Sequence, residues 1–488
     1  MNSELFLTCF LLYVVGVIGF GWWLSRRRQT GEEFLLGGRA VPLFLTLGTT
    51  IATMVGTGSS MGAVGKAYTH GWAGALYGIG GAAGILIAAW LFAPVRKYRF
   101  VTMAEEISSY VGANRSVANL VAVFTYLSSV GWLGAHILGG GKYLVYVTGI
   151  DPLLAKSLIA CGFSIYAVIG GYRAVIWTDT LQAIVLFAGF TLTAWFSLQF
   201  AGGWEGLSKA QQSLSPTTSS VPVLSLFSLA VVIAVGVLGT PSFRQRIYSG
   251  DSTTAVRKAF AISGLLYLAF SLLPAIIGLT ACNTNPELSD PDQAFPWMAT
   301  QLLPVAIGII VLIAGLSATM SSASSDAVSG VTTVIRDLHQ LAFKRLPPPE
   351  KVVRCSRVSL TATTLLALGM ALISDQIISY IASMISFFIT GMCVAGILGR
   401  TWDRYNAPGA VASLIGASAT AGAFQLNAFL SPDNNWNDIW GNPVIPSLVV
   451  ATLLGVVVSL LTPDDPCSHE EAVARLAKER EGMENPAD

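Results

Sequence analysis

A row of hydroxyl side chains inside an apolar segment is the part of this sequence best suited to binding an ion. The segment from Ile313 to Asp337 is long enough to cross a bilayer, yet serines stand at positions 317, 321, 322, 324, 325 and 329. At about 100° per helical residue, five of its residues share an arc of about 160°: Ala318, Ser321, Ser322, Ser324 and Ser325. Oxygens at membrane depth are costly unless they bind something, so we predict an ion site here.

The elements that position these serines are predicted to be membrane helices. The chain has 488 residues, of which 53% are hydrophobic and 11% charged. A soluble protein would carry roughly a quarter charged residues. Apolar runs long enough to span a bilayer recur along the whole chain, so we expect an all-α polytopic membrane protein. The first run, Leu5 to Leu24, is too long for a signal peptide and lacks a small-residue cleavage site, which predicts a retained helix.

Breaks between the apolar runs predict about thirteen spans within one transporter domain. They cover residues 4–24, 42–67, 72–94, 117–147, 152–171, 175–200, 222–241, 258–281, 303–334, 358–374, 377–398, 408–425 and 444–462. An N-terminus outside and a C-terminus in the cytoplasm leave only four of the 28 basic residues on the outer side, as the positive-inside rule favours. Arg244 and Arg246 are assigned to an inward-facing loop in this arrangement.

Several classes of function are excluded by composition and motifs. The net charge is +1 and the basic residues are spread along one membrane face, so no nucleic-acid partner is expected. The six cysteines and four histidines show no disulfide or metal spacing. No nucleotide-binding motif precedes a helix, so we expect neither ATP-driven transport nor an enzyme. The expected partners are the lipid bilayer and a small-molecule solute, with no obligate protein partner, in the cell membrane (for a bacterium, the inner membrane).

Two predicted spans carry glycines at corresponding places, a pattern typical of transporters built from inverted repeats. The second span contains Gly48, Gly56, Gly58, Gly62 and Gly65, and the seventh contains Gly236 and Gly239 before Pro241. Their spacing fits two halves at residues 42–200 and 222–398. Glycine lets a helix unwind and present carbonyl oxygens to an ion, whereas close helix packing is the alternative explanation.

Four stretches of the sequence resemble motifs of the sodium:solute symporter family. They are EEFLLGGRAVP at 32–42, GAVGKAYTHG at 62–71, GGYRAVIWTDTLQ at 170–182 and ATMSSASSDAVSGVTTVIRDL at 318–338. The resemblance extends from about residue 5 to 462. It implies a LeuT-type fold with an extra N-terminal helix (4–24), two inverted five-helix repeats, two C-terminal helices (408–462) and a cytoplasmic tail (463–488).

The resemblance also implies a sodium site made of five oxygens. These are the backbone carbonyls of Ala52, Val55 and Ala318 and the hydroxyls of Ser321 and Ser322. Neutral oxygen ligands suit a hard cation that must be released inside the cell. The alternative is that both serines only pack helices or bond to the preceding turn.

A second sodium site, as in sialic acid symporters of this family, is implied by Asp179, Ser324 and Ser325 together with Ser321. Asp179 lies just inside a span, where a lone carboxylate is costly and usually functional. Alternatively, Asp179 caps a helix start or pairs with Arg173. Asp326 lies toward the edge of the serine stripe, either beside an ion or bonded to a neighbouring helix.

The solute pocket is expected beside the unwound stretches, near the bilayer midplane. By position we expect it to be lined by Met54, Gly56, Ser59, Trp132, His136, Gly236 and Gly239. Met54 stands where proline permeases share an Asp, and Trp132 where sialate symporters place an Arg, so neither substrate is expected. Plain packing is the alternative role for Trp132, and hydrogen bonding within the core is the alternative for His136.

These observations predict a sodium-coupled secondary active symporter. It would import a small organic solute, such as an amino acid or a monocarboxylate, by alternating access, with one or two Na⁺ as coupling ions. A sodium-responsive sensor or a channel on the same scaffold is the alternative.

Overall fold

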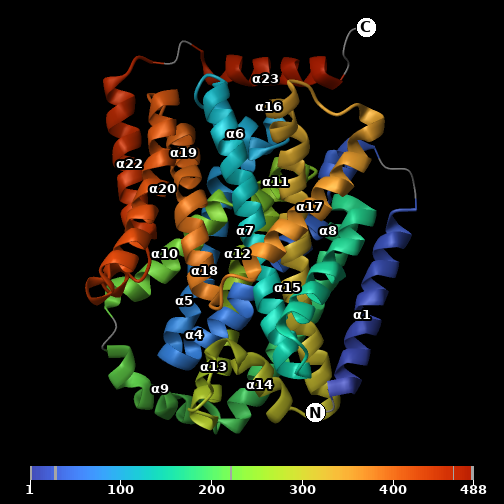
Figure 1. Ribbon diagram of the computed structural model, residues 1–488, viewed down its shortest axis with the longest axis vertical. Coiled ribbons are helices and arrows are strands. Elements are labelled where there is room, and N and C mark those ends of the chain that lie inside the picture. The colour runs from blue at the N-terminus through green and yellow to red at the C-terminus, as the bar shows by residue number, and fades with distance from the viewer. Residues whose placement is uncertain (1–2, 27–29, 220–221, 465–466, 485–488) are drawn as a thin grey trace.

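A computed structural model of the chain describes residues 3–26, 30–219, 222–464 and 467–484, and its regular elements are helices throughout this part (Figure 1). The long helices are α1 Ser3–Leu24, α5 Ala75–Leu91, α7 Arg115–Thr148, α8 Pro152–Phe200, α10 Val223–Gly239, α12 Thr253–Phe270, α15 Val305–Thr333, α17 Val352–Ala371, α20 Ala407–Leu430 and α22 Val444–Leu461. Shorter helices complete the bundle: α2 Gly31–Leu36, α3 Leu43–Met54, α4 Ala63–His70, α6 Met103–Ser109, α9 Gly203–Ser219, α11 Pro241–Ser249, α13 Leu272–Thr284, α14 Ala294–Gln301, α16 His339–Phe343, α18 Ile377–Met384, α19 Thr390–Thr401, α21 Trp436–Trp440 and α23 His469–Glu484.

The number of membrane-spanning helices depends on how broken helices are counted. Nine helices of the described chain are long and apolar enough to cross a membrane, or ten if the bent pair α10 and α11 counts as one span. Two predicted spans, 152–171 and 175–200, are joined in α8, whose 49 residues would extend over about 74 Å if straight, more than twice the thickness of a bilayer core. The helix is interrupted at Gly171, where φ is 57° and ψ is −157°. Thirteen crossings, and the repeat boundaries, therefore stay predictions.

Both helices predicted to unwind are broken. Helix α3 ends at Met54, and Val55 leaves the helical region with φ −90° and ψ 66°, before a π-helical turn at Gly58–Gly62 leads into α4. Helix α10 ends at Gly239, Thr240 is extended, and α11 starts at Pro241 with a 43° bend. A proline at the first position of a helix lacks the amide hydrogen that would otherwise stay unpaired, which explains the start of α11.

Helix α15 runs through the centre of the bundle and packs against α7, α8 and α3. Every residue from Ala314 to Thr333 is buried. Small residues allow this close packing, since a Cβ on Gly189 would lie 2.4 Å from the Cβ of Ala314, and one on Gly330 would lie 2.9 Å from the Cβ of Ser129. The serine row is therefore held rigidly among neighbouring helices.

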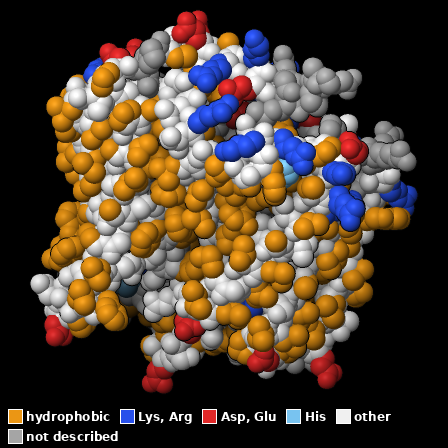
Figure 2. All heavy atoms as spheres, turned by 45° about the horizontal axis from the view of Figure 1, so that its top comes forward, with side chains coloured by type: hydrophobic (Ala, Val, Ile, Leu, Met, Phe, Trp, Pro, Cys, Tyr) orange, Lys and Arg blue, Asp and Glu red, His pale blue; other side chains and the backbone are white. Residues whose placement is uncertain are grey.

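Basic and apolar side chains are separated on the surface. Figure 2 shows Lys and Arg side chains gathered at the end of the molecule that carries α16 and α23, while hydrophobic side chains cover the flanks. Large apolar side chains stay exposed there, among them Trp90 (72%) and Trp195 (60%), as expected for a surface that faces lipid. The two ends of the chain lie at opposite ends of the bundle in Figure 1. The predicted orientation agrees with this separation and stays a prediction.

Candidate functional site

The break at the end of α3 leaves carbonyl groups without helical partners. Because Val55 departs from helical geometry, the carbonyl oxygen of Ala52 is free to accept hydrogen bonds from outside the helix. The hydroxyls of Ser321 and Ser322, on α15, each lie 3.1 Å from this oxygen. Ser321 Oγ is also 3.2 Å from the carbonyl oxygen of Ala318. Four of the five residues of the predicted sodium site therefore meet.

The fifth residue, Val55, lies at the break itself and is fully buried. Its neighbour Gly56 faces the serine pair, because a Cβ on Gly56 would lie 2.7 Å from Ser322 Oγ. The carbonyl oxygen of Thr53, which is not among the predicted ligands, lies 3.2 Å from Ser322 Oγ. Neutral oxygens dominate this site, and the described part of the chain holds no group of three His, Cys, Asp or Glu residues placed to bind a metal. Such a ligand set suits a monovalent hard cation rather than zinc or calcium.

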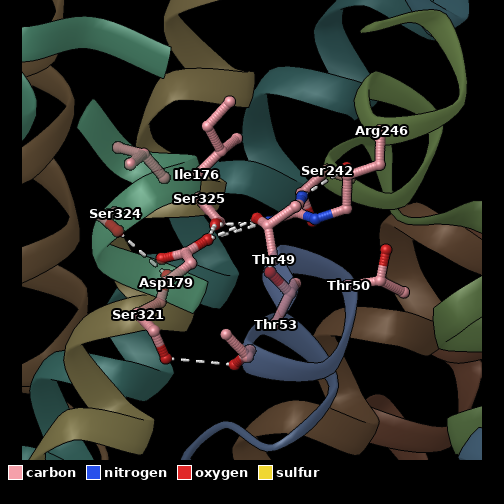
Figure 3. A network of polar contacts seen from close by, with 12 residues as sticks. Thr49, Thr50, Thr53, Ile176, Asp179, Ser242, Arg246, Ser321, Ser324 and Ser325 are labelled. Carbon is pink, nitrogen blue, oxygen red and sulfur yellow. Dashed lines mark hydrogen bonds and ion pairs between the residues drawn. The ribbon is translucent and has the colours of Figure 1, made fainter. Parts of the chain in front are cut away.

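Asp179 lies in the interior of α8 and is fully buried. Its Oδ2 accepts hydrogen bonds from Thr49 Oγ1 at 2.6 Å and Ser325 Oγ at 2.8 Å, and lies 3.4 Å from Nη2 of Arg246 (Figure 3). The alternatives of a helix cap or a pair with Arg173 are wrong, because Asp179 is far from the helix start and Arg173 is exposed.

Ser324 forms its hydrogen bond within α15. Its hydroxyl donates to the carbonyl oxygen of Ser321, 3.0 Å away, in its own helix. Of the residues implied for a second sodium, Asp179 and Ser325 are in direct contact, whereas Ser324 bonds to the adjacent turn. The Ser321 carbonyl and hydroxyl lie between the two clusters along α15.

The assignment of Arg244 and Arg246 to a loop is wrong. Both belong to α11, in which all nine residues are buried, and their side chains are 2% and 0% exposed. Arg244 lies 3.5 Å from the buried Glu106, and Arg246 reaches the Asp179 cluster. A count of charges treats every Arg as a loop residue, so it misses an Arg that is paired within the bundle. The sequence did offer one signal for the missed pairing. A lone carboxylate in an apolar span, Asp179, requires a partner of opposite charge.

A pocket lies beside both helix breaks. It is lined by Thr53, Met54, Gly56, Gly58, Tyr77, Trp132, His136, Ile233, Val237, Thr240, Ser242, Phe243, Tyr267 and Asp326. Met54, Gly56, Trp132 and His136 thus lie where the sequence placed them. The aromatic residues Tyr77, Phe243 and Tyr267 were not anticipated, because they come from segments without a recognisable motif.

Three residues predicted to line the pocket lie elsewhere. Ser59 bridges the break, with its hydroxyl 2.9 Å from the carbonyl oxygen of Met54. Gly236 and Gly239 allow α10 to approach Ile385 and Ile389, since added Cβ atoms would come within 2.7 Å and 2.6 Å of those side chains. The packing explanation therefore fits both glycines.

Two polar links connect the pocket wall to the helix breaks. His136 Nδ1 lies 3.0 Å from Thr57 Oγ1, and His136 Nε2 lies 3.2 Å from Asp326 Oδ2. Trp132 Nε1 donates to Thr240 Oγ1 at 2.9 Å, in the break between α10 and α11. Asp326 is thus bonded to a neighbouring helix, one of the two roles considered for it.

Comparisons with known proteins agree with this architecture. Residues 34–416 match the model of the sodium:solute symporter family. The chain is 24% identical to a sodium/pantothenate symporter of Haemophilus influenzae, with 83% of this chain and 87% of that protein covered. It is 25% identical to a sodium/glucose cotransporter of Vibrio parahaemolyticus, with 83% and 82% covered.

The structure of a Na⁺-coupled sialic acid symporter in a substrate-bound, outward-open state superimposes with a TM-score of 0.79. The alignment covers 94% of this chain and 98% of that one at 20% sequence identity, which establishes the LeuT-type fold. The family match extends over most of the chain and includes both broken helices and the serine row of α15. This chain belongs to the sodium:solute symporter family.

Proposed function

We propose that this protein is a sodium-coupled secondary active symporter that imports a small organic solute through the pocket between the two helix breaks. The observation that carries the proposal is the meeting of the Ala52 carbonyl with the hydroxyls of Ser321 and Ser322. These oxygens belong to two helices, α3 and α15, so an ion held between them joins the helices. The pocket lies directly beside this junction, with Met54 and Gly56 in its lining.

Coupling follows from the position of the ion. Sodium entering from outside bridges α3 and α15 and favours the form that accepts solute. Solute then closes the outer side, and loss of sodium to the cytoplasm releases both. One charge moved across 100 mV supplies about 2.3 kcal/mol, and a tenfold sodium gradient about 1.4 kcal/mol. One sodium per cycle therefore supports roughly several-hundred-fold accumulation of a neutral solute.

The pocket favours a small solute with both polar and apolar surface. Aromatic rings of Tyr77, Trp132, Phe243 and Tyr267 supply apolar contact, and the His136–Asp326 pair supplies polar groups. The names of the relatives mention pantothenate and glucose, so the family takes solutes of this general kind. We propose an amino acid, a monocarboxylate or a similar molecule, carried unchanged and without enzymatic chemistry.

The test is uptake into proteoliposomes containing the purified full-length chain. Amino acids, monocarboxylates, sugars and vitamins are supplied outside with either NaCl or choline chloride. The proposal predicts saturable uptake of at least one solute that requires sodium and accumulates against its gradient. A channel would give uptake that does not saturate, and a sensor would give none.

The variant with Ser321→Ala and Ser322→Ala tests the ion site, because it removes two of the five proposed ligands. We expect sodium-driven uptake to fall at least tenfold. Ser197→Ala is the matched control, since this buried serine donates only to Thr193 of its own helix, at 2.7 Å. If the double variant keeps wild-type sodium dependence, the site assignment is wrong.

A further inference from the structure

Helix α23 lies across one end of the bundle, beyond the part of the chain that matches the family model (Figure 1). That match ends at residue 416, whereas α23 begins at His469. The end of the molecule that α23 covers is the one predicted to face the cytoplasm, through which a solute would have to leave. Its contacts there indicate whether it takes part in the opening of that side.

The first contact fixes the start of α23 on both sides of the loop 99–102, the inner loop, which precedes α6. The ring of His469 packs against the ring of Tyr98, just before the inner loop, with centroids 5.0 Å apart. It also lies 5.3 Å from the ring of Tyr110, which follows α6. His469 Nδ1 lies 3.1 Å from the carbonyl oxygen of Ser109, the last residue of α6. His469 thus joins the segments that flank the inner loop.

The second contact holds the inner loop itself. Arg480 donates to the carbonyl oxygen of Arg99, and its side chain is 13% exposed. The same oxygen accepts a hydrogen bond from Arg39 Nη1 at 2.6 Å, and this nitrogen also lies 3.0 Å from the carbonyl oxygen of Phe100. Arg39 belongs to the segment that leads into α3, so α23 and the approach to the proposed ion site hold the same stretch of backbone.

The inner loop forms one wall of a small cavity next to the solute pocket. This cavity is lined by Val101, Thr102, Met103, Pro241, Gln245, Tyr248, Ser329, Thr332 and Thr333. Pro241 lies between Thr240 and Ser242, which line the solute pocket. Thr102 Oγ1 donates to Asp337 Oδ1 at 3.0 Å, which ties the inner loop to the helical turn that continues α15. Movement of the inner loop would therefore open this cavity toward the predicted cytoplasmic end.

Helix α23 is attached weakly enough to leave this position. Among residues 469–480, Ala472 is the one buried residue. A cavity of about 240 Å³, lined in part by Leu476 and Arg480 of α23 and by Asp337, leaves this side of the helix incompletely packed. Elements with few buried contacts separate from the rest of a protein at a low free-energy cost.

We propose that α23 is a strap that keeps the cytoplasmic side closed while it holds the inner loop, and that solute and sodium leave after it releases. The inference rests on the proposed function, because a transporter needs this side to open in each cycle. Release of Arg480 takes one of two hydrogen bonds from the carbonyl of Arg99 and so weakens the hold on the inner loop. The inner loop can then move away from α11 and α15.

The test is hydrogen–deuterium exchange of the purified full-length protein in NaCl and in KCl. In the wild type, KCl should speed exchange of residues 99–109, of α11 and of α23 together, because loss of sodium favours the form open to the cytoplasm. His469→Ala combined with Arg480→Gln removes both anchors. We expect this variant to exchange at least about tenfold faster than the wild type in these segments even in NaCl.

Arg475→Gln is the matched control on the same helix. Arg475 is exposed, and it lies 3.4 Å from Glu479, one turn further along α23, so its replacement leaves both anchors in place. The control should exchange like the wild type in both salts.

Two results with the double variant would overturn the inference. Faster exchange of α23 with unchanged exchange of residues 99–109 and α11 would show that α23 is attached without closing anything. Unchanged exchange of α23 itself would show that His469 and Arg480 do not hold it. Either result leaves the proposed function intact.

The wild type decides even if the double variant does not fold. Faster exchange of residues 99–109 in KCl while α23 stays protected would overturn the strap. The proposed function is checked separately in the same data, at the proposed ion site. Identical exchange of α3 and α15 in NaCl and KCl would contradict the proposed sodium coupling itself.

Discussion

His136 and Asp326 form a buried pair between α7 and α15, with Nε2 3.2 Å from Oδ2 and side chains that are 4% and 5% exposed. The other ring nitrogen of His136 lies 3.0 Å from the hydroxyl of Thr57, which in turn lies 3.2 Å from that of Thr319. Thr57 belongs to the break between α3 and α4. The pocket wall is thereby hydrogen-bonded to the segment whose carbonyl groups we propose as sodium ligands, which links the pocket directly to the candidate ion site.

Replacing His136 by Ala should destabilise the protein by about 3 kcal/mol, because Asp326 would stay buried without its partner. Thermal unfolding of the purified protein in detergent measures this change. Because Thr57 also loses one of its two hydrogen-bond partners, the concentration of sodium that half-saturates binding should rise.

The pair can be isolated with a double-mutant cycle. Asp326→Asn alone should cost less than His136→Ala, and the double variant should be more stable than the sum of the two effects predicts, by about 0.5–3 kcal/mol. Strictly additive effects would mean that the two residues act independently, contrary to their contact.

Gly56 should be essential for the proposed sodium site because it allows the break of α3 to approach α15. A Cβ at this position would lie 2.7 Å from Ser322 Oγ and 2.9 Å from His136 Cε1. Gly56→Ala should therefore push the Ser322 hydroxyl away and raise the sodium concentration for half-saturation at least tenfold, or about 1.4 kcal/mol. The measurement is ²²Na⁺ binding to the purified protein.

Gly369→Ala is the control for this prediction. Gly369 lies in α17, is exposed, and an added Cβ would meet nothing within 4 Å. Its replacement should leave sodium binding unchanged. Wild-type affinity in Gly56→Ala would show that the ion does not lie against the break.

The part of the candidate ion site that lies on α15 was predictable as a cluster because its residues are close together in sequence. Ala318, Ser321 and Ser322 are within two turns of one helix, so helical periodicity alone places them on one face. The glycines that follow Val55 and the proline after Gly239 likewise marked both helix breaks. Such signals are local, and local geometry follows directly from sequence.

The partner of Asp179 could not be predicted in the same way. Arg246 is 67 residues away along the chain, and the pair forms only because the bent helix α11 turns into the bundle. Hydropathy and charge counting describe each segment separately, so a buried pair between segments appears as one costly carboxylate and one loop arginine. The lining of the pocket by Tyr77, Phe243 and Tyr267 was missed for the same reason.

Trp132 should control solute binding through the second helix break. Its indole Nε1 donates to Thr240 Oγ1 at 2.9 Å, and both residues line the pocket. Trp132→Phe removes the donor while keeping an aromatic ring, at a cost of about 1 kcal/mol in stability. We expect the KM for solute to rise severalfold, whereas sodium binding without solute should stay unchanged.

Thr240→Val removes the other half of the same hydrogen bond and serves as the matched variant. Because each change breaks the one bond, the double variant should raise KM little more than either single variant does. A double variant whose effect is the product of the two would show that Trp132 contacts the solute independently of Thr240.

The interruption of α8 should depend on Gly171. Its φ of 57° and ψ of −157° fall in a region that only glycine occupies readily, and an added Cβ would lie 2.6 Å from the Phe34 ring of α2. Gly171→Ala should therefore lower the free energy of unfolding by at least about 3 kcal/mol, through backbone strain and steric clash together. Gly149→Ala is the reference for a left-handed backbone without a steric clash, because Gly149 has φ +70° and ψ 11° and nothing within 4 Å of an added Cβ. It should cost only about 1 kcal/mol, the penalty of a left-handed backbone alone. If thermal unfolding showed the same loss of stability for Gly171→Ala and Gly149→Ala, the Phe34 ring would move aside without cost. Helix α2 would then not hold the two halves of α8 in place.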